Sequence, residues 1–160
     1  MKKGKFYLIL PDIRSCHNVG AMFRTADAFG VDKIFLVGYT PHPPKPQIDK
    51  VALGAEKWVE WEGYDDLKKL IKKLKKENFK IIGLEKTKKS VEIEKLKKEI
   101  KEIGDLVLIV GNEVDGIKPG ILKLCDHVVH IPMYGKKESL NVSIAGGIAM
   151  YLFSQDRVVV

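Results

Sequence analysis

The sequence predicts a single α/β domain, a largely parallel sheet with helices on its faces. Six short β-rich segments alternate with helical segments along the 160 residues. Several of these strands are unbroken apolar runs without alternation, which is typical of strands that are covered on both faces. The length suits one domain with a sizeable core. We therefore expect residues 1–160 to form one domain, without a further domain before the first strand or after the last helix.

The six strands are predicted from short runs rich in Val, Ile, Leu, Phe and Tyr. Pro11 ends the first run, the third is the weakest, and the fifth, DLVLIVG, is the clearest. They span residues 5–10, 32–38, 57–61, 79–85, 105–111 and 127–132. Helical patterns lie at 18–29, 64–77, 92–103, 118–124 and 140–154. The Pro-rich stretch at 39–47 is expected to be an exposed loop.

The first predicted helix contains an arginine with two possible roles. Asn18 is its candidate N-cap and Gly30 the glycine after its end. A buried stripe follows the i, i+3, i+4, i+7 spacing: Val19, Met22, Phe23, Ala26 and Phe29. Gly20, Arg24 and Asp27 share a flank away from that stripe, where Gly20 would leave room for a ligand or partner backbone. Arg24 is either a surface charge paired with Asp27 or a group aimed at a ligand.

The charge balance favours polyanionic partners. Formal net charge is +7 with a pI near 9.3. Many lysines lie between Lys68 and Lys101, interleaved with glutamates, and the pattern favours solvated helix faces, with contact to nucleic acid as the alternative. No apolar run has the roughly 18 residues of a membrane span. Cys16 and Cys125 are far apart, and the histidines show no ligand spacing, so we expect no disulfide, no metal site and a cytoplasmic protein.

Three loops that follow predicted strands carry the unusual residues. In open parallel sheets, ligands bind beyond the carboxyl ends of the strands. The first loop is residues 11–18, and the second, 111–116, presents the amide of Asn112 and the carboxylate of Glu113. The third loop follows Pro132, bears Gly and Lys, and ends where Ser139 or Asn141 caps the last helix.

The last predicted helix is apolar nearly all round, so it must be buried on every side. Gly146 and Gly147 inside it cost about 1 kcal/mol each relative to alanine, and close helix packing would offset that cost. A C-terminal helix of a small domain can become fully buried against its own copy in a second chain. We therefore predict a homodimer.

Together these segments resemble a known family. HNVGAMFRTADAFG, LIVGNEVDGI and IPMYGKKESLNVSIAGGIAMYLF are similar, in order and spacing, to the three signature motifs of SpoU/TrmH-type RNA ribose methyltransferases of the SPOUT superfamily. The resemblance implies one SPOUT-type domain with a C-terminal trefoil knot and without an added RNA-binding domain. It also implies S-adenosylmethionine as methyl donor and a ribose 2′-hydroxyl of RNA as acceptor. The knot follows from the resemblance alone, since true knots are nearly absent from proteins.

The resemblance assigns roles to individual residues. The catalytic set would be Asn18, Arg24, Glu113, Ser139 and Asn141. The cofactor would be held by Leu84, Gly111, Ile131, Met133, Ser139 and Leu140. In the family the arginine acts across the dimer, on a cofactor held by the other subunit. A positive charge on Arg24 would stabilise the alkoxide that develops as the 2′-hydroxyl attacks, and because an arginine is effectively always protonated, this role is favoured over that of a base.

The RNA substrate is expected to be tRNA rather than ribosomal RNA. Candidate phosphate contacts, each near a predicted active-site loop, are Arg14, Lys45, Lys136 and Lys137. Two other functions stay open: a noncatalytic RNA-binding protein of the same fold, and a SPOUT enzyme that methylates a base nitrogen. Arg24 on the first helix favours the ribose.

Overall fold

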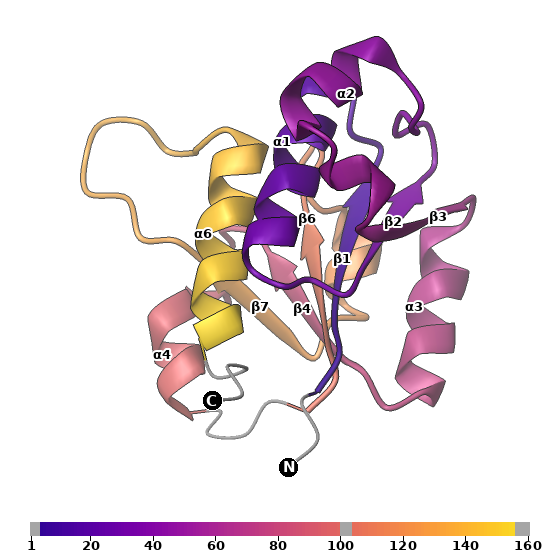
Figure 1. The fold of residues 1–160 in the computed structure, drawn as a ribbon. Coiled ribbons are helices and arrows are strands. Elements are labelled where there is room, and N and C mark those ends of the chain that lie inside the picture. The colour runs from indigo at the N-terminus through magenta and orange to yellow at the C-terminus, as the bar shows by residue number, and fades with distance from the viewer. Residues whose placement is uncertain (1–3, 100–103, 156–160) are drawn as a thin grey trace.

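The computed structural model describes residues 4–99 and 104–155, and within them seven strands form one sheet (Figure 1). Every pairing between neighbouring strands is parallel, and the strand order is β3-β2-β1-β6-β4-β7-β5. Helices cover both faces of this sheet, so the predicted fold class is confirmed. Because all strands run the same way, the loops after them gather at one edge.

The strands match five of the six predictions closely. Their bounds are β1 Phe6–Pro11, β2 Lys33–Val37, β3 Glu60–Tyr64, β4 Lys80–Leu84, β5 Val91–Glu92, β6 Leu106–Val110 and β7 His127–His130. The third strand begins later than predicted because residues 55–57 form a 3-10 turn, η1 Ala55–Lys57. The two-residue β5 was not predicted, since so short a strand leaves no pattern in the sequence.

The helices are α1 Cys16–Ala28, α2 Pro46–Ala52, α3 Leu67–Lys76, α4 Ile93–Glu99, α5 Pro119–Leu122 and α6 Val142–Ser154. The predicted helix at 92–103 is therefore described as far as residue 99, and residues 100–103 lie outside the described residues. None of the described helices combines the length and the apolar character that a bilayer crossing requires.

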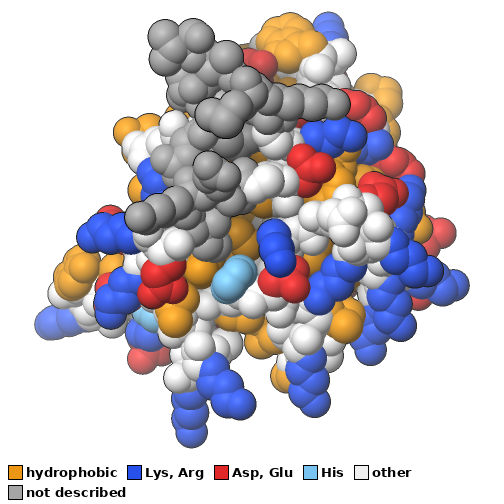
Figure 2. All heavy atoms as spheres, turned by 90° about the horizontal axis from the view of Figure 1, so that it is seen from below, with side chains coloured by type: hydrophobic (Ala, Val, Ile, Leu, Met, Phe, Trp, Pro, Cys, Tyr) orange, Lys and Arg blue, Asp and Glu red, His pale blue; other side chains and the backbone are white. Residues whose placement is uncertain are grey.

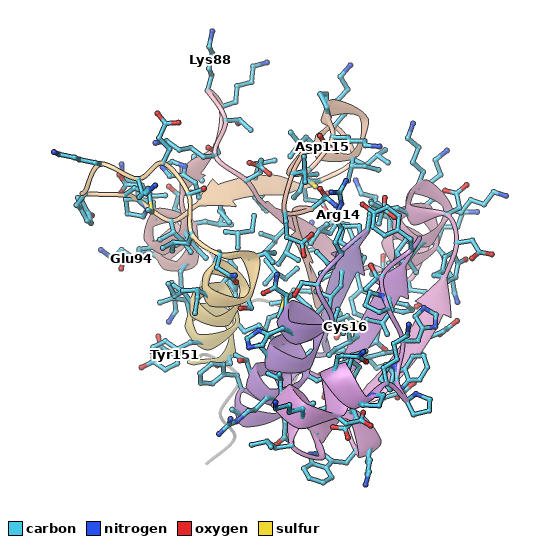
Figure 3. All side chains as sticks on the ribbon, turned by 90° about the horizontal axis from the view of Figure 1, so that it is seen from above. Arg14, Cys16, Lys88, Glu94, Asp115 and Tyr151 are labelled. Atoms are coloured by element: carbon cyan, nitrogen blue, oxygen red, sulfur yellow. The ribbon has the colours of Figure 1, made fainter. Side chains whose placement is uncertain are left out.

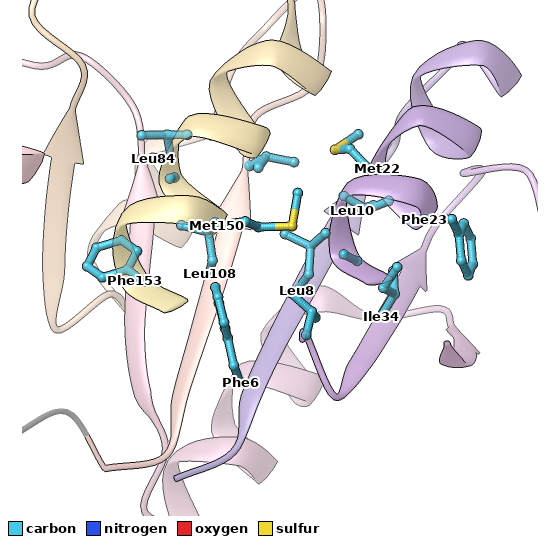
Figure 4. Close-up of a cluster of buried hydrophobic side chains, with 14 of the residues drawn as sticks. Phe6, Leu8, Leu10, Met22, Phe23, Ile34, Leu84, Leu108, Met150 and Phe153 are labelled. Atoms are coloured by element: carbon cyan, nitrogen blue, oxygen red, sulfur yellow. The ribbon is translucent and has the colours of Figure 1, made fainter. Parts of the chain in front are cut away.

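The first face of the sheet packs under α1, α2, α4 and α6. Phe6, Leu8 and Leu10 of β1 point to this side and are fully buried, as are Met150 and Phe153 of α6 (Figure 4). Alternate residues of a strand point to opposite faces, so Ile9 belongs to the other side. This explains why the strand sequences show no polar alternation: both faces are core.

The second face packs under α3 and α5. Leu70, Ile71 and Leu74 of α3 are buried against it. Asp66 caps the helix by accepting a hydrogen bond from the backbone N–H of Lys69. The remaining positions of α3 are mostly lysines, and Lys and Arg side chains gather over this helix in the view from the amino-terminal edge (Figure 2).

Helix α1 starts earlier than predicted, and Asn18 is not its cap. The hydroxyl of Ser15 accepts a hydrogen bond from the backbone N–H of Asn18 at 3.1 Å and takes that role. Asn18 therefore lies in the first turn and is 6% exposed. Gly30 follows the helix with φ +66°, as predicted.

Helix α2 was not predicted. It occupies the space beside Gly20 that was expected to receive a ligand or a partner backbone. The stretch 39–47 was predicted as a loop, but Pro46 begins a helix whose Ile48 and Ala52 are buried one turn apart. A Cβ on Gly20 would lie 2.6 Å from the carbonyl oxygen of Ile48. The close approach at Gly20 is thus made by this chain's own α2 rather than by a ligand or a partner.

The pairing of Arg24 with Asp27, one of the two roles that the sequence left open for this arginine, is absent. The carboxylate of Asp27 accepts a hydrogen bond from Trp58 Nε1 at 2.8 Å. Within residues 4–99 and 104–155, the side chain of Arg24 is exposed and forms neither a hydrogen bond nor an ion pair.

Candidate active site

An open pocket, called here the main pocket, lies at the carboxyl ends of β4, β6 and β7. It is lined by the end of β4 and by the loops at 111–116 and 131–141. All six residues that the resemblance assigns to the cofactor line it: Leu84, Gly111, Ile131, Met133, Ser139 and Leu140. The structure therefore brings together residues from three distant segments of the chain.

The 111–116 turn is closed on itself and tied to the first loop. Asn112 and Gly116 exchange backbone hydrogen bonds of 3.3 and 3.0 Å, and Gly116 has φ +64°. A Cβ on Gly111 would lie 2.8 Å from the Cα of Gly116, so the turn requires a glycine there. The Asn112 side-chain amide donates to the carbonyl oxygen of Asp12 and, at 3.0 Å, to the hydroxyl of Tyr39.

Glu113 connects the second loop to the start of α1. Its carboxylate accepts hydrogen bonds from the backbone N–H groups of Arg14 at 3.1 Å and Ser15 at 3.2 Å. It also accepts one from the side-chain amide of Asn18 at 3.2 Å, across 95 residues of sequence. Burial alone would raise the pKa of Glu113, but these hydrogen bonds outweigh it and the pKa is lowered from its ordinary value. Glu113 is therefore held as a carboxylate at neutral pH.

Glu85 is a member of the pocket that the sequence did not reveal. One of its carboxylate oxygens accepts a hydrogen bond from the backbone N–H of Ile117 at 2.8 Å. The same carboxylate lies against Gly116 and Gly111, where a Cβ would collide with it. Its only sequence signal was its position directly after an apolar strand, and there we assigned it to the strand itself.

The main pocket combines apolar walls with negative charge. Leu84, Ile131 and Leu140 supply branched apolar side chains, and the lining contains three carboxylates, those of Glu85, Glu113 and Glu138, but one ammonium group, that of Lys86. In a chain of net charge +7 this local excess of carboxylates is notable. The lining suits a ligand that has a flat apolar part and carries positive charge.

The third loop ends in a capped helix and carries two of the predicted phosphate contacts. Asn141 caps α6, because its side-chain oxygen accepts hydrogen bonds from the backbone N–H of Ser143 at 2.8 Å and from the Ser143 hydroxyl at 2.7 Å. The loop from β7 to α6 projects from the body of the domain (Figure 1), and Lys136 and Lys137 are exposed on it.

The other predicted phosphate contacts lie in different places. Arg14 lies at the carboxyl edge of the sheet near Asp115 (Figure 3), and its guanidinium is hydrogen-bonded to the hydroxyl of Tyr39. This hydrogen bond is the main cause that raises the pKa of Arg14. Lys45 is exposed directly before α2 and does not line the main pocket.

Arg24 does not line the main pocket of its own chain. It lies on α1 next to Thr25, which borders an exposed and mainly apolar surface that we call the α1–α6 face. This face is made by Thr25 of α1 and by Phe29 directly after α1, with Ile144, Ile148 and Tyr151 of α6, and Glu94 of α4 borders it. Ile144 is 55% exposed, Ile148 37% and Tyr151 49%. The all-round burial expected of α6 is thus not reached within one chain.

Within the described ranges, 4–99 and 104–155, no three His, Cys, Asp or Glu side chains are grouped so that they could hold a metal ion. His130 borders the main pocket, and its Nδ1 shares a hydrogen bond of 2.9 Å with the hydroxyl of Ser90.

Comparison with known proteins gives relatives along the whole chain. It is 34% identical over 158 residues to the tRNA (guanosine(18)-2'-O)-methyltransferase of Aquifex aeolicus, a match covering 98% of this chain and 72% of that protein. It is 35% identical over 150 residues to the 23S rRNA (guanosine-2'-O-)-methyltransferase RlmB of Coxiella burnetii, covering 94% of this chain and 58% of that one. The chain therefore spans less than two thirds of the second relative.

The fold is similar to that of a solved structure, and the sequence matches the model of a protein family. The crystal structure of an AdoMet-bound rRNA methyltransferase from Sinorhizobium meliloti superposes with a TM-score of 0.88 at 24% identity, over 99% of this chain and 59% of that one. The model of the SpoU rRNA Methylase family matches residues 5–151, which include all three motif segments up to Tyr151. The chain belongs to the SpoU rRNA Methylase family.

Proposed function

We propose that this protein transfers a methyl group from S-adenosylmethionine to a ribose 2′-hydroxyl of RNA. The observation that carries the proposal is the hydrogen bond between Asn18 and Glu113 at the rim of the main pocket, because it joins the first and second motifs beside the third. The names of the two relatives, one acting on tRNA and one on 23S rRNA, both describe guanosine 2′-O-methylation.

S-adenosylmethionine fits the chemistry of the main pocket. When bound, it supplies a methyl group on a positively charged sulfur. Leu84, Ile131 and Leu140 offer apolar surfaces to its adenine, and backbone groups at Gly111 and Met133 are available for hydrogen bonds. Ser139 adds a hydroxyl. The surplus of carboxylates in the lining favours this cation over an anionic nucleotide of similar size.

This chain's own residues then have separate tasks. Glu113, ionised, fixes Asn18 and the loop before α1. Arg24 stabilises the negative charge that develops on the 2′-oxygen as its proton leaves. Asn141 holds the start of α6 and with it the end of the third loop, so Ser139 stays at the pocket.

The site is complete only in a homodimer. Arg24 is exposed, has no partner in the described part of its chain, and does not line its own main pocket. The adjacent α1–α6 face leaves three large apolar side chains of α6 in water. A second copy of the chain covering this face would bury them and would bring its Arg24 to the neighbouring pocket.

We further propose the trefoil knot of the superfamily in the C-terminal part, and a cytoplasmic location. The knot is supported by membership of the family and by the sheet order, in which β4 lies between β6 and β7. The location is supported by free cysteines and by RNA as the substrate.

The preferred RNA is tRNA, with ribosomal RNA as the second candidate. The relative of which this chain covers the larger share acts on tRNA, and the other acts on 23S rRNA. Arg14, Lys45, Lys136 and Lys137 are all exposed and available to phosphates. Binding through them should weaken steeply as salt rises.

The test is transfer of labelled methyl from S-adenosylmethionine to bulk tRNA and, separately, to ribosomal RNA. The product is digested to nucleosides, and alkaline hydrolysis locates the label, because a 2′-O-methyl group blocks cleavage at that site. Label on a base nitrogen would overturn the ribose assignment. Absence of any transfer, with RNA still bound, would favour a noncatalytic RNA-binding protein.

A further inference from the structure

A second pocket lies on the far side of the 111–116 turn from the main pocket. It is bordered by Pro11 and Asp12 at the end of β1, by Tyr39, and by Lys118 before α5. Asn112 and Gly116 line both pockets, so the two cavities share one wall. The helix after β1 covers the first face of the sheet and the helix after β6 covers the second, and ligands of open parallel sheets bind in the crevice where helices diverge in this way.

Tyr39 presents an immobilised aromatic ring at this second pocket. The residue is 59% exposed. Its hydroxyl is held by the side-chain amide of Asn112 at 3.0 Å and by the guanidinium of Arg14, and its backbone N–H donates to the carboxylate of Asp12 at 3.2 Å. The ring is thus fixed at its polar end while much of its surface stays open. Unpaired bases of RNA stack on aromatic rings presented in this way.

Three cationic side chains lie at or near the second pocket. Arg14 is exposed next to Tyr39. Lys118 lines the second pocket, is exposed, and forms no salt bridge within the part of the chain that the structure describes. Lys68 reaches the same helix, because its Nζ would lie 3.5 Å from a Cβ on Gly120.

Two carboxylates oppose these three cations. That of Asp12 is engaged by the loop at Tyr39, and Asp115 attracts Arg14. Of these five side chains, Lys118, Asp12 and Asp115 line the pocket itself, and Arg14 and Lys68 lie outside its lining and bring the sum to one positive charge. Asp115 remains as an acceptor for a base N–H.

From this we infer that the second pocket binds an unpaired nucleotide next to the one that is methylated, with its base stacked on Tyr39 and its phosphate on Arg14 and Lys118. The inference rests on the proposed function for the choice of RNA as ligand. It assigns to this chain a subsite for single-stranded RNA, so the substrate segment must be open in a loop and not paired in a helix.

The test is direct binding of bulk tRNA to the full chain at one fixed salt concentration, without S-adenosylmethionine. Tyr39→Ala should weaken binding roughly 5- to 140-fold, the equivalent of one lost base stack. Tyr39→Phe, which keeps the ring and loses the hydrogen bonds of the hydroxyl, should weaken it much less. Trp58→Ala, an equally exposed aromatic at 62%, lies before β3 at the opposite edge of the sheet and should leave binding unchanged.

The phosphate contact has its own pair of variants. Lys118→Ala should weaken binding and make it less sensitive to salt, whereas Lys57→Ala, an exposed lysine of η1, should do neither. Affinity for S-adenosylmethionine should stay at the wild-type value in all five variants, which shows that they fold.

A crosslink gives a second readout. tRNA containing 4-thiouridine should crosslink on irradiation to a peptide that contains Tyr39, and unlabelled tRNA should compete. If Tyr39→Ala binds tRNA as tightly as the wild type and the crosslink falls elsewhere, the subsite is wrong, while methyl transfer by the wild type would still support the proposed function. If the wild type binds through Tyr39 but transfers no methyl group, the proposed function fails and the subsite stands.

Discussion

The two faces of the sheet are covered by helices of opposite character. On the first face, α6 turns Ile144, Ile148 and Tyr151 outward, and the ring of Tyr151 packs on Phe29 of α1 with 5.4 Å between the centroids. On the second face, α3 buries a narrow apolar stripe and turns lysines outward (Figure 2). A helix whose outer side is covered by lysines is well solvated and needs no partner. An apolar outer surface of the kind that α6 presents marks an interaction site.

The difference between the outer surfaces of α6 and α3 indicates that the two faces of the sheet have different functions. The helices on the first face carry Arg24 and the exposed apolar side chains of the α1–α6 face, so both assembly and chemistry are expected to depend on this face. The second face carries charge without packing on its outer side, and changes there should be small. Substitutions on the two faces can therefore test whether the contrast is real.

The largest effect is expected at Arg24. Arg24→Ala removes the positive charge that we propose stabilises the developing alkoxide, and kcat for methyl transfer should fall about 10²–10³-fold. Affinity for S-adenosylmethionine, measured by calorimetry, should be nearly unchanged, because the residues proposed to hold the cofactor all belong to the main pocket and do not include Arg24. Normal turnover by this variant would remove Arg24 from the chemistry.

Mixed dimers sharpen that result. Gly111→Val should block the main pocket, because even a Cβ there meets Gly116 at 2.8 Å. Neither this variant nor Arg24→Ala should be active alone. A mixture of the two chains should regain activity, since one of the two sites then has an intact pocket and the partner's arginine. No recovery in dimers shown to be mixed would mean that Arg24 acts within its own chain.

The next effect is on assembly. Ile148→Glu would bury an unpaired carboxylate in the α1–α6 face of a dimer, so the variant should be a folded monomer with little methyl transfer. Sedimentation velocity measures the first outcome and labelled methyl transfer the second. A variant that remains dimeric would place the interface elsewhere.

A smaller effect is expected on the pH dependence of stability. The folded-state pKa of Glu113 is lowered from 4.5, so its carboxylate stabilises the fold above that pH, and the contribution is lost as pH falls through the folded-state pKa. Glu113→Gln should therefore lose less stability than the wild type between neutral pH and about pH 3. Urea unfolding at a series of pH values gives the comparison, and parallel curves would contradict it.

The smallest effect is expected on the second face. Lys72 has lysines three and four residues away on both sides, so Lys72→Glu should relieve repulsion and change the free energy of unfolding by no more than about 0.5 kcal/mol. It places on α3 the same side chain that Ile148→Glu places on α6, and the dimer should persist. Unchanged tRNA binding would support a solvated face, and weaker binding would show that α3 touches RNA.

Much of the fold was predictable because both sheet faces are core. Apolar runs such as the one within residues 105–111 are then predicted only as buried strands, and Gly30 marks the end of a helix. Helix α2 was not predictable, because prolines before it indicated a loop and only Ile48 and Ala52 are buried. The N-cap was misassigned because Ser15 and Asn18 are both good caps three residues apart, and burial beside Glu113 decided between them.

The site was predictable as far as its motifs reach. Residues of the three loops meet because parallel strands end at one edge, and the resemblance assigned them to a shared pocket. Glu85 was missed because its partners, Gly116 and the N–H of Ile117, are brought to it by folding and leave no local pattern. Tyr39 was missed for the same reason, since its hydroxyl is held by two residues from different loops.

One carboxylate, that of Glu113, joins the loop after β6 to three groups near the start of α1, on Arg14, Ser15 and Asn18. Changes at these two places should consequently be epistatic. In a double-mutant cycle of Glu113→Gln and Asn18→Ala, the coupling free energy should be about 0.5–3 kcal/mol rather than zero. In homologous chains the residues at these two places should then change together. A chimera that takes only the loop after β6, or only the start of α1, from another family member should lose function, and one that takes both should keep it.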